Sequence, residues 1–312
     1  MAEKTPVALL TGFLGSGKTT LLSRLLGHPD MGETAVIVNE LGEVAIDHHL
    51  LRRVDERTVL LKSGCVCCSL RGDLADELRD LLGRRERGEI PAFRRVVVET
   101  TGLADPAPIL YTLLSEPVVK HHFRLEHVIA TVDAVNGLPE PESVRQVAAA
   151  DTVVVTKTDL NDSADVRSTL EQLNPTATVL EASFGDVEPL TLFDAPGTDL
   201  RSVPTPDDHH GHGDVGAVCV YLEEELDWGA FGIWLTMLLQ ARGDDILRVK
   251  GLLNVGGDGP VLVNGVQHVV HPPEHLDAWP DDDRRSRIVF IGRDFTPDEL
   301  SASLLAFNAA GH

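Results

Sequence analysis

The segment Gly12–Thr19 could bind the phosphates of a nucleotide. Its residues, GFLGSGKT, satisfy the pattern G-x-x-x-x-G-K-[ST], and they lie between an apolar run and a stretch of helical period. The glycines allow backbone N–H groups to turn towards phosphate, Lys18 would reach the β and γ oxygens, and the Thr19 hydroxyl would ligate Mg²⁺. We therefore predict a phosphate loop formed by Gly12, Gly15, Ser16, Gly17, Lys18, Thr19 and Thr20.

An acidic residue and a glycine follow the apolar run 96–98. Glu99 ends this predicted strand at the edge where ligands gather in open α/β sheets, so it could hold the Mg²⁺ shell or orient the attacking water. The backbone N–H of Gly102 could approach the γ-phosphate. Lys18, Thr19, Glu99 and Gly102 are thus the predicted catalytic residues.

The segment Thr156–Asp159 resembles the base-reading motif N-K-x-D, with Thr in place of Asn. Asp159 would accept hydrogen bonds from the ring N–H and the amine of guanine, which leaves adenine without these partners. The stem of Lys157 would pack over the base, and Ser183, after the next predicted strand, could close over its other side. We therefore predict GTP and GDP as ligands.

Three thiols, those of Cys65, Cys67 and Cys68, lie within four residues. Thiolates are soft ligands for Zn²⁺ or another late transition metal, but three leave a tetrahedral ion one ligand short. Glu40, Glu43, one of the histidines 121 and 122, or an exchangeable water could complete the site. A redox-active cluster and a chance grouping are the competing interpretations.

A second group of metal-ligating side chains consists of His209, His210 and His212. Neutral imidazoles suit Zn²⁺ and Co²⁺, so this group is a candidate auxiliary site with weak affinity. The alternative is a polar loop that binds no ion.

The elements that would position these residues follow from the hydrophobic pattern. Short apolar runs alternate with helical segments from residue 6 to about 181, which predicts a doubly wound, mostly parallel sheet of the P-loop NTPase type in residues 1–187. Residues 188–214, rich in Pro, Asp, Thr and Gly, are predicted to be a linker. Residues 215–312 are predicted to form a smaller α+β domain.

The bulk properties restrict the partners and the compartment. The net charge of −22 in 312 residues disfavours binding to nucleic acid, because a polyanion would be repelled. The first apolar run, 7–10, is too short for a signal sequence or a membrane span, and clustered cysteines fit a reducing compartment. We therefore expect a cytoplasmic protein that does not associate with membranes.

Several segments together resemble the metal-binding P-loop GTPases of the CobW/YjiA type. The matching sequences are TGFLGSGKTTLL, VNELGEVAIDHHLL, SGCVCCSLRGDL, VVVETTGLADPAPI, TKTD, LRVKGLL and SRIVFIG, and they extend over most of the chain. The resemblance implies slow, metal-modulated GTP hydrolysis, with Zn²⁺ or Co²⁺ bound at the cysteines. It marks 40–47 as a nucleotide-responsive segment in which Asp47 joins Thr19 and Glu99 around Mg²⁺.

By this resemblance the chain would be a metallochaperone that transfers its ion to a client protein or cofactor pathway, with residues 215–312 as a CobW-type C-terminal domain. A homodimer is a candidate assembly. Two other functions stay open on the residues alone: a zinc-buffering or storage protein with vestigial GTPase activity, and a P-loop kinase or ATPase with structural cysteines.

Overall fold

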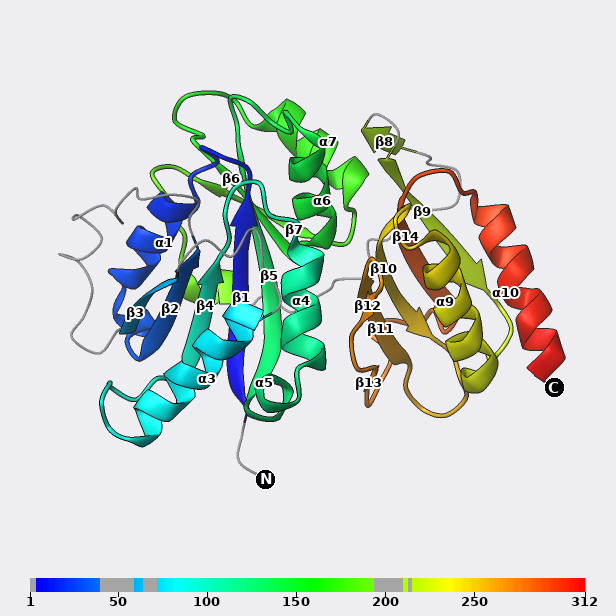
Figure 1. Cartoon of the computed structure of the whole chain (residues 1–312). Coiled ribbons are helices and arrows are strands. Elements are labelled where there is room, and N and C mark those ends of the chain that lie inside the picture. The colour runs from blue at the N-terminus through cyan, green and yellow to red at the C-terminus, as the bar shows by residue number, and fades with distance from the viewer. Residues whose placement is uncertain (1–3, 40–58, 64–71, 194–209, 213–214, 312) are drawn as a thin grey trace. The chain divides into compact units, whose positions relative to one another are not determined.

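The computed structural model describes residues 4–39, 59–63, 72–193, 210–212 and 215–311. The chain divides into two compact units, one formed by residues 1–167 and 178–197 and the other by residues 168–177 and 198–312. Each unit contains its own sheet (Figure 1).

The first unit is built on a seven-stranded sheet in the order β3-β2-β4-β1-β5-β6-β7, in which every neighbouring pair is parallel. The predicted apolar runs lie within these strands. Strands β1, β4 and β6 are buried on both faces and therefore need no alternation of polar residues. Their bounds are β1 Thr5–Gly12, β2 Thr34–Asn39, β3 Val59–Ser63, β4 Arg95–Glu99, β5 Phe123–Asp133, β6 Thr152–Thr156 and β7 Thr178–Ala182.

Helices cover both faces of this sheet. The core on one face joins the sheet to α1 (Lys18–Leu26), the short 3₁₀ helix η1 (Pro29–Met31) and α8 (Pro189–Phe193). The remaining helices of this unit are α3 Gly72–Glu86, α4 Pro106–Ser115, α5 Pro117–His122 and α6 Pro141–Ala149. Helix α7, Ala164–Leu173, lies between β6 and β7 in sequence and is divided between the two units at residue 167. The predicted doubly wound α/β fold is confirmed.

The second sheet is antiparallel, in the order β12-β11-β10-β14-β9-β8 with β13 paired to β11. Its strands are β8 His210–His212, β9 Val215–Leu222, β10 Ile246–Leu253, β11 Val261–Val266, β12 Val269–Val270, β13 Glu274–His275 and β14 Ser286–Gly292. One core cluster joins this sheet to α9 (Trp228–Arg242) and α10 (Pro297–Gly311). The predicted smaller α+β domain is likewise confirmed.

The segment predicted as a linker, 188–214, differs from that expectation at both ends. Residues 189–193 form α8, and the side chains of Leu192 and Phe193 are buried in the core of the first unit. Five residues are too few to produce a visible helical period. Towards the other end, His210–His212 pairs with β9 as strand β8.

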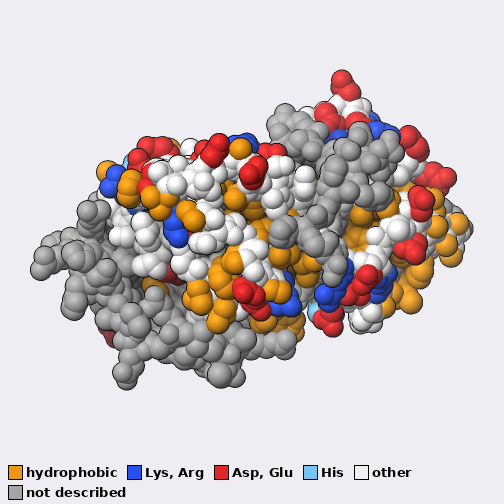
Figure 2. Space-filling view, turned by 90° about the horizontal axis from the view of Figure 1, so that it is seen from above, with side chains coloured by type: hydrophobic (Ala, Val, Ile, Leu, Met, Phe, Trp, Pro, Cys, Tyr) orange, Lys and Arg blue, Asp and Glu red, His pale blue; other side chains and the backbone are white. Residues whose placement is uncertain are grey.

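The described surface mixes both signs of charge. Asp and Glu side chains are interspersed with Lys and Arg on the face seen from above in Figure 2. None of the helices in the described ranges combines the length and the apolar character that crossing a bilayer requires.

Candidate nucleotide site

The phosphate loop connects β1 to α1, as predicted. Gly12, Gly15 and Gly17 all have positive φ, 141°, 74° and 93°, which places their backbone in conformations that favour glycine. A Cβ atom on Gly12 would lie 2.3 Å from Thr131 Oγ1, so no other residue fits there. The loop conformation therefore depends on these glycines.

The loop ends at a helix terminus that is available to an anion. Gly17 caps α1 without a side-chain hydrogen bond, and the first turn contains no acidic residue. The first backbone N–H groups and the helix dipole both favour a negatively charged ligand here. Lys18 adds a positive charge, with its Nζ donating to the carbonyl oxygens of Gly12 at 2.7 Å and Phe13 at 3.0 Å.

Thr19, in the first turn of α1, contacts Glu99 at the carboxyl end of β4. The Thr19 hydroxyl donates a hydrogen bond of 2.9 Å to Glu99 Oε1, and the Glu99 side chain is buried. Mg²⁺ prefers oxygen ligands, and in nucleotide sites protein and phosphate oxygens coordinate it together. The oxygens of Thr19 and Glu99, beside the phosphate loop, fit this preference. Thr19 and Glu99 would hold this ion, which supplies charge neutralisation on the β- and γ-phosphate oxygens.

The turn after Glu99 lies against the phosphate loop. Thr100 is fixed to β1, with its N–H donating to Leu10 O and its hydroxyl to Thr11 Oγ1, each at 2.9 Å. A Cβ atom on Gly102 would lie 2.5 Å from Leu14 N, so the two backbones are in direct contact. Gly102 thus lies directly beside the phosphate loop.

The predicted base-reading loop follows β6 and reaches the same sheet edge. The Thr156 hydroxyl donates to Ser16 O at 2.7 Å, so this threonine joins the base loop to the phosphate loop. Its buried hydroxyl gives a structural reason for Thr at a position where the motif has Asn. Asp159 is exposed and accepts a hydrogen bond from the Ser183 hydroxyl at 3.1 Å, which brings the two predicted base contacts together. Thr20 is exposed on α1.

Asp133, at the end of β5, was not predicted as a site residue. Its carboxylate accepts a hydrogen bond from Lys157 Nζ at 3.1 Å and others from the backbone and side chain of Asn136. Burial works to raise the pKa of Asp133, but the hydrogen bonds from Asn136 and Lys157 outweigh it and lower the pKa. Lys157 has a φ of 57°, a backbone conformation that is uncommon for residues other than glycine. An acid that ends a buried strand, as Glu99 does, was the signal available in the sequence.

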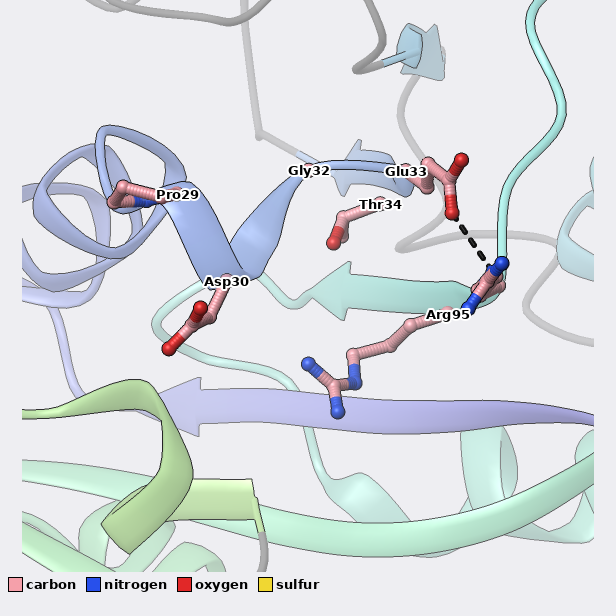
Figure 3. A pocket seen from close by; sticks show the side chains of 7 residues that line it. Pro29, Asp30, Gly32, Glu33, Thr34 and Arg95 are labelled. Carbon is pink, nitrogen blue, oxygen red and sulfur yellow. Dashed lines mark ion pairs between the residues drawn. The ribbon is translucent and has the colours of Figure 1, made fainter.

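A cavity of about 220 Å³ adjoins the phosphate loop. It is lined by Phe13, Leu14 and Ser16 together with Asp133, Asn136 and residues leading into α6. A larger hollow of about 460 Å³ lies at the opposite edge of the sheet, where β2 and β4 begin (Figure 3). Both acidic and basic side chains line it. There Arg94 pairs with Glu33 at 2.8 Å, and Arg95 stacks on Phe193. Ligands of parallel α/β sheets bind at the carboxyl ends of strands, so the phosphate-loop edge is the candidate site.

The predicted transition-metal ligands cannot be placed in the same way. Cys65, Cys67, Cys68, Glu40, Glu43, Asp47 and His209 lie outside the described residues, and the side chains of His210 and His212 are also not described. Within the described part of the chain, no three His, Cys, Asp or Glu side chains form a metal-binding group. His121 and His122 end α5 at the amino end of β5, opposite the phosphate loop.

The strands that lead into the unplaced segments are nevertheless well defined. Asn39, which precedes Glu40, ends β2, and Ser63, which precedes Gly64, ends β3. Asn39 and Ser63 are Cα partners in the parallel pairing of these strands. Val38 is in turn the partner of Glu99 on β4. Strands β2 and β3 therefore end side by side, at the edge that carries Glu99 and the phosphate loop.

Comparison with known proteins places both units in one family. Residues 6–181 match the CobW/HypB/UreG nucleotide-binding domain, and residues 215–308 match the C-terminal domain of the cobalamin synthesis protein CobW. The zinc chaperone YjiA of Escherichia coli is 35% identical over 309 residues, which cover 95% of this chain and 96% of YjiA. The zinc chaperone CobW of Pseudomonas aeruginosa is 32% identical, over 96% of this chain and 91% of its own.

A solved structure is similar over nearly the whole length. The Zn(II)-bound YjiA GTPase from E. coli superposes with a TM-score of 0.76 at 30% identity, covering 98% of this chain and 99% of that one.

Proposed function

The chain belongs to the CobW/HypB/UreG family and is a GTPase, and on this basis we propose that it is a metallochaperone that binds Zn²⁺ or Co²⁺ under nucleotide control. The ion would be held by Cys65, Cys67 and Cys68 with Glu40 or Glu43, and delivered to a client protein or cofactor pathway. The names of the relatives, zinc chaperones in two bacteria, support the metal and the general role.

One observation carries this proposal: the order of strand ends along the sheet edge. The ends of β3, β2, β4 and β1 lead, in that order, to the cysteine segment, the Glu40 segment, Glu99 and the phosphate loop. Neighbouring strands lie about 4.8 Å apart, so the two outermost ends are separated by roughly 15 Å. This is close enough for a segment that contacts the γ-phosphate to contribute a metal ligand as well.

The described side chains support the nucleotide half of the mechanism. Lys18 and the N-terminus of α1 would bind the phosphates, and Thr19 and Glu99 would hold Mg²⁺. Lys157, Asp159 and Ser183 would bind the guanine base from the loops after β6 and β7. Gly102 would donate its N–H to the γ-phosphate, and loss of that phosphate would release the turn. Segment 40–47, which the family resemblance marks as nucleotide-responsive, would change with it.

Nucleotide control requires that GTP and GDP forms bind the metal differently, because a ligand without differential affinity shifts no equilibrium. We expect tighter Zn²⁺ binding with a non-hydrolysable GTP analogue than with GDP. Equal affinities in the two forms would contradict the switch and leave a buffering protein.

The decisive experiment is GTP hydrolysis with Mg²⁺, with and without stoichiometric Zn²⁺ or Co²⁺, in the wild type and in a Cys65/Cys67/Cys68→Ser variant. The Cys219→Ser variant is the matched control, because Cys219 is a free thiol on β9 in the second sheet. We expect metal to change the wild-type and control rates and to leave the triple variant unaffected. A wild-type rate that ignores metal would overturn the proposal.

A further inference from the structure

Gln146 links α6 to the turn that follows Glu99. Its side chain is 1% exposed, and its Nε2 donates to the carbonyl oxygens of Gly102 at 3.0 Å and Ala104 at 3.1 Å. More than forty residues separate the two segments in sequence. The same amide group therefore binds two carbonyls of this turn, those of residues 102 and 104, from outside it.

The orientation of this amide follows from its partners. Backbone carbonyl oxygens only accept hydrogen bonds, so the NH₂ group of Gln146 must face them. An ionised carboxylate of the same shape only accepts hydrogen bonds, so its oxygen would face the two carbonyl oxygens and repel them. Replacing Gln146 with Glu thus changes the hydrogen bonding and almost nothing in volume.

The turn that follows Glu99 also contacts the phosphate loop, so a shift of the turn would change the nucleotide site. The Gly102 backbone lies against Leu14 of the phosphate loop, where even a Cβ atom would approach Leu14 N to 2.5 Å. Thr100 fixes the start of the turn to β1. At the end of the turn, Asp105 caps the N-terminus of α4 by accepting a hydrogen bond from Ala107 N at 3.0 Å. Among the described residues, Gln146 supplies the side-chain hydrogen bonds to the middle of the turn.

We propose that Gln146 is a positioning residue for GTP hydrolysis, which holds the Gly102 N–H where it meets the γ-phosphate. This inference rests on the proposed role of Gly102. Because GDP has no γ-phosphate, Gln146 contributes to the binding and hydrolysis of GTP and not to the binding of GDP. It touches neither nucleotide nor metal itself and acts through the turn.

The test uses the full-length Gln146→Glu variant, with affinities for GDP and for a non-hydrolysable GTP analogue measured with Mg²⁺, and single-turnover hydrolysis of GTP. We expect the analogue affinity and the hydrolysis rate to fall about tenfold or more, because a lost buried hydrogen bond costs roughly that factor or more. GDP affinity should stay within about twofold of the wild type, a difference too small to represent a lost contact.

The pH dependence provides a readout that general destabilisation does not move. Burial raises the pKa of a carboxyl group, and the carboxyl group introduced by Gln146→Glu could, once protonated, donate one hydrogen bond to the turn. The deficit of Gln146→Glu relative to wild type should therefore shrink as the pH falls. In Gln146→Met, which has a similar shape and no donor, the deficit should not depend on pH.

The control is Val119→Ala on α5, a fully buried apolar residue whose truncation destabilises the same domain without touching the turn. Equal losses of GDP and analogue affinity in the Gln146 variants, as in this control, would overturn the inference. So would wild-type hydrolysis in both variants. A wild-type protein whose GTPase rate ignores zinc would overturn the metallochaperone proposal alone and leave the result on Gln146 standing.

Discussion

The Thr19 hydroxyl donates a hydrogen bond of 2.9 Å to Glu99 Oε1, although the two residues are 80 positions apart in sequence. One lies in the first turn of α1 and the other ends β4, and the parallel pairing of β4 with β1 brings both to the same edge. This pair defines where a Mg²⁺ ion and the terminal phosphates would lie.

The first prediction concerns this pair. Glu99→Gln retains the shape of the side chain and removes its charge, so Mg²⁺ affinity should weaken and the single-turnover rate should fall by about 10² or more. Nucleotide binding without Mg²⁺ should change little. The control is Glu116→Gln, an acid at the start of α5 and outside the site. Unchanged hydrolysis in Glu99→Gln would exclude Glu99 from the catalytic group.

The second prediction compares two glycines with opposite surroundings. Gly102→Ala would push a methyl group onto the Leu14 backbone, whereas Gly232 on α9 has nothing within 4 Å of its Cβ position. We expect Gly102→Ala to weaken GTP binding and Gly232→Ala to raise the free energy of unfolding by roughly 0.5–1 kcal/mol. Calorimetry and nucleotide titration distinguish the two effects. Normal GTP binding by Gly102→Ala would refute the close contact.

The third prediction concerns Asp133 and pH. Because the pKa of Asp133 is lowered in the folded state, its ionised form favours folding. The stabilisation is complete above the ordinary Asp pKa of about 3.9 and is lost as the pH falls through the lower folded value. The difference in unfolding free energy between wild type and Asp133→Asn should therefore be largest near neutral pH and shrink below about pH 4.

Asp133→Asn should also weaken guanine nucleotide binding, since Lys157 loses its ion pair beside the base loop. Asp159→Asn serves as the comparison, because it removes the predicted base contact directly. A stability difference that stays constant down to about pH 2, well below the ordinary Asp pKa, would contradict the role assigned to the Asp133 carboxylate.

The fourth prediction tests α8 as part of the first unit's core. Leu192 is fully buried there, so Leu192→Ala should destabilise that unit by about 2–5 kcal/mol in urea unfolding. Leu190, in the same helix, is 57% exposed, and its replacement by Ala should change stability by no more than about 0.5 kcal/mol. Equal effects of the two substitutions would place residues 189–193 outside the core.

The sequence by itself predicted the glycine-rich loop between β1 and α1, the strand that ends in Glu99 and the loop that follows β6, and the structure has each of them at the expected place in the fold. Their chemistry lies in residues that are consecutive, and the glycines and β-branched runs that shape them act over a few positions. The alternating pattern of apolar runs and helical segments was sufficient for the α/β class, and the same reasoning predicted the smaller α+β domain.

Only the tertiary structure decided which distant residues support that site. Asp133 reaches Lys157, Gln146 reaches Gly102, and Asn39 pairs with Ser63 because strand order and helix packing bring them together. A hydrogen bond between residues 44 positions apart leaves no periodicity in the chain, and the register of parallel strands is set by burial over the whole sheet. The same holds for α8, which is too short to show a period and is defined by the apolar core that it covers.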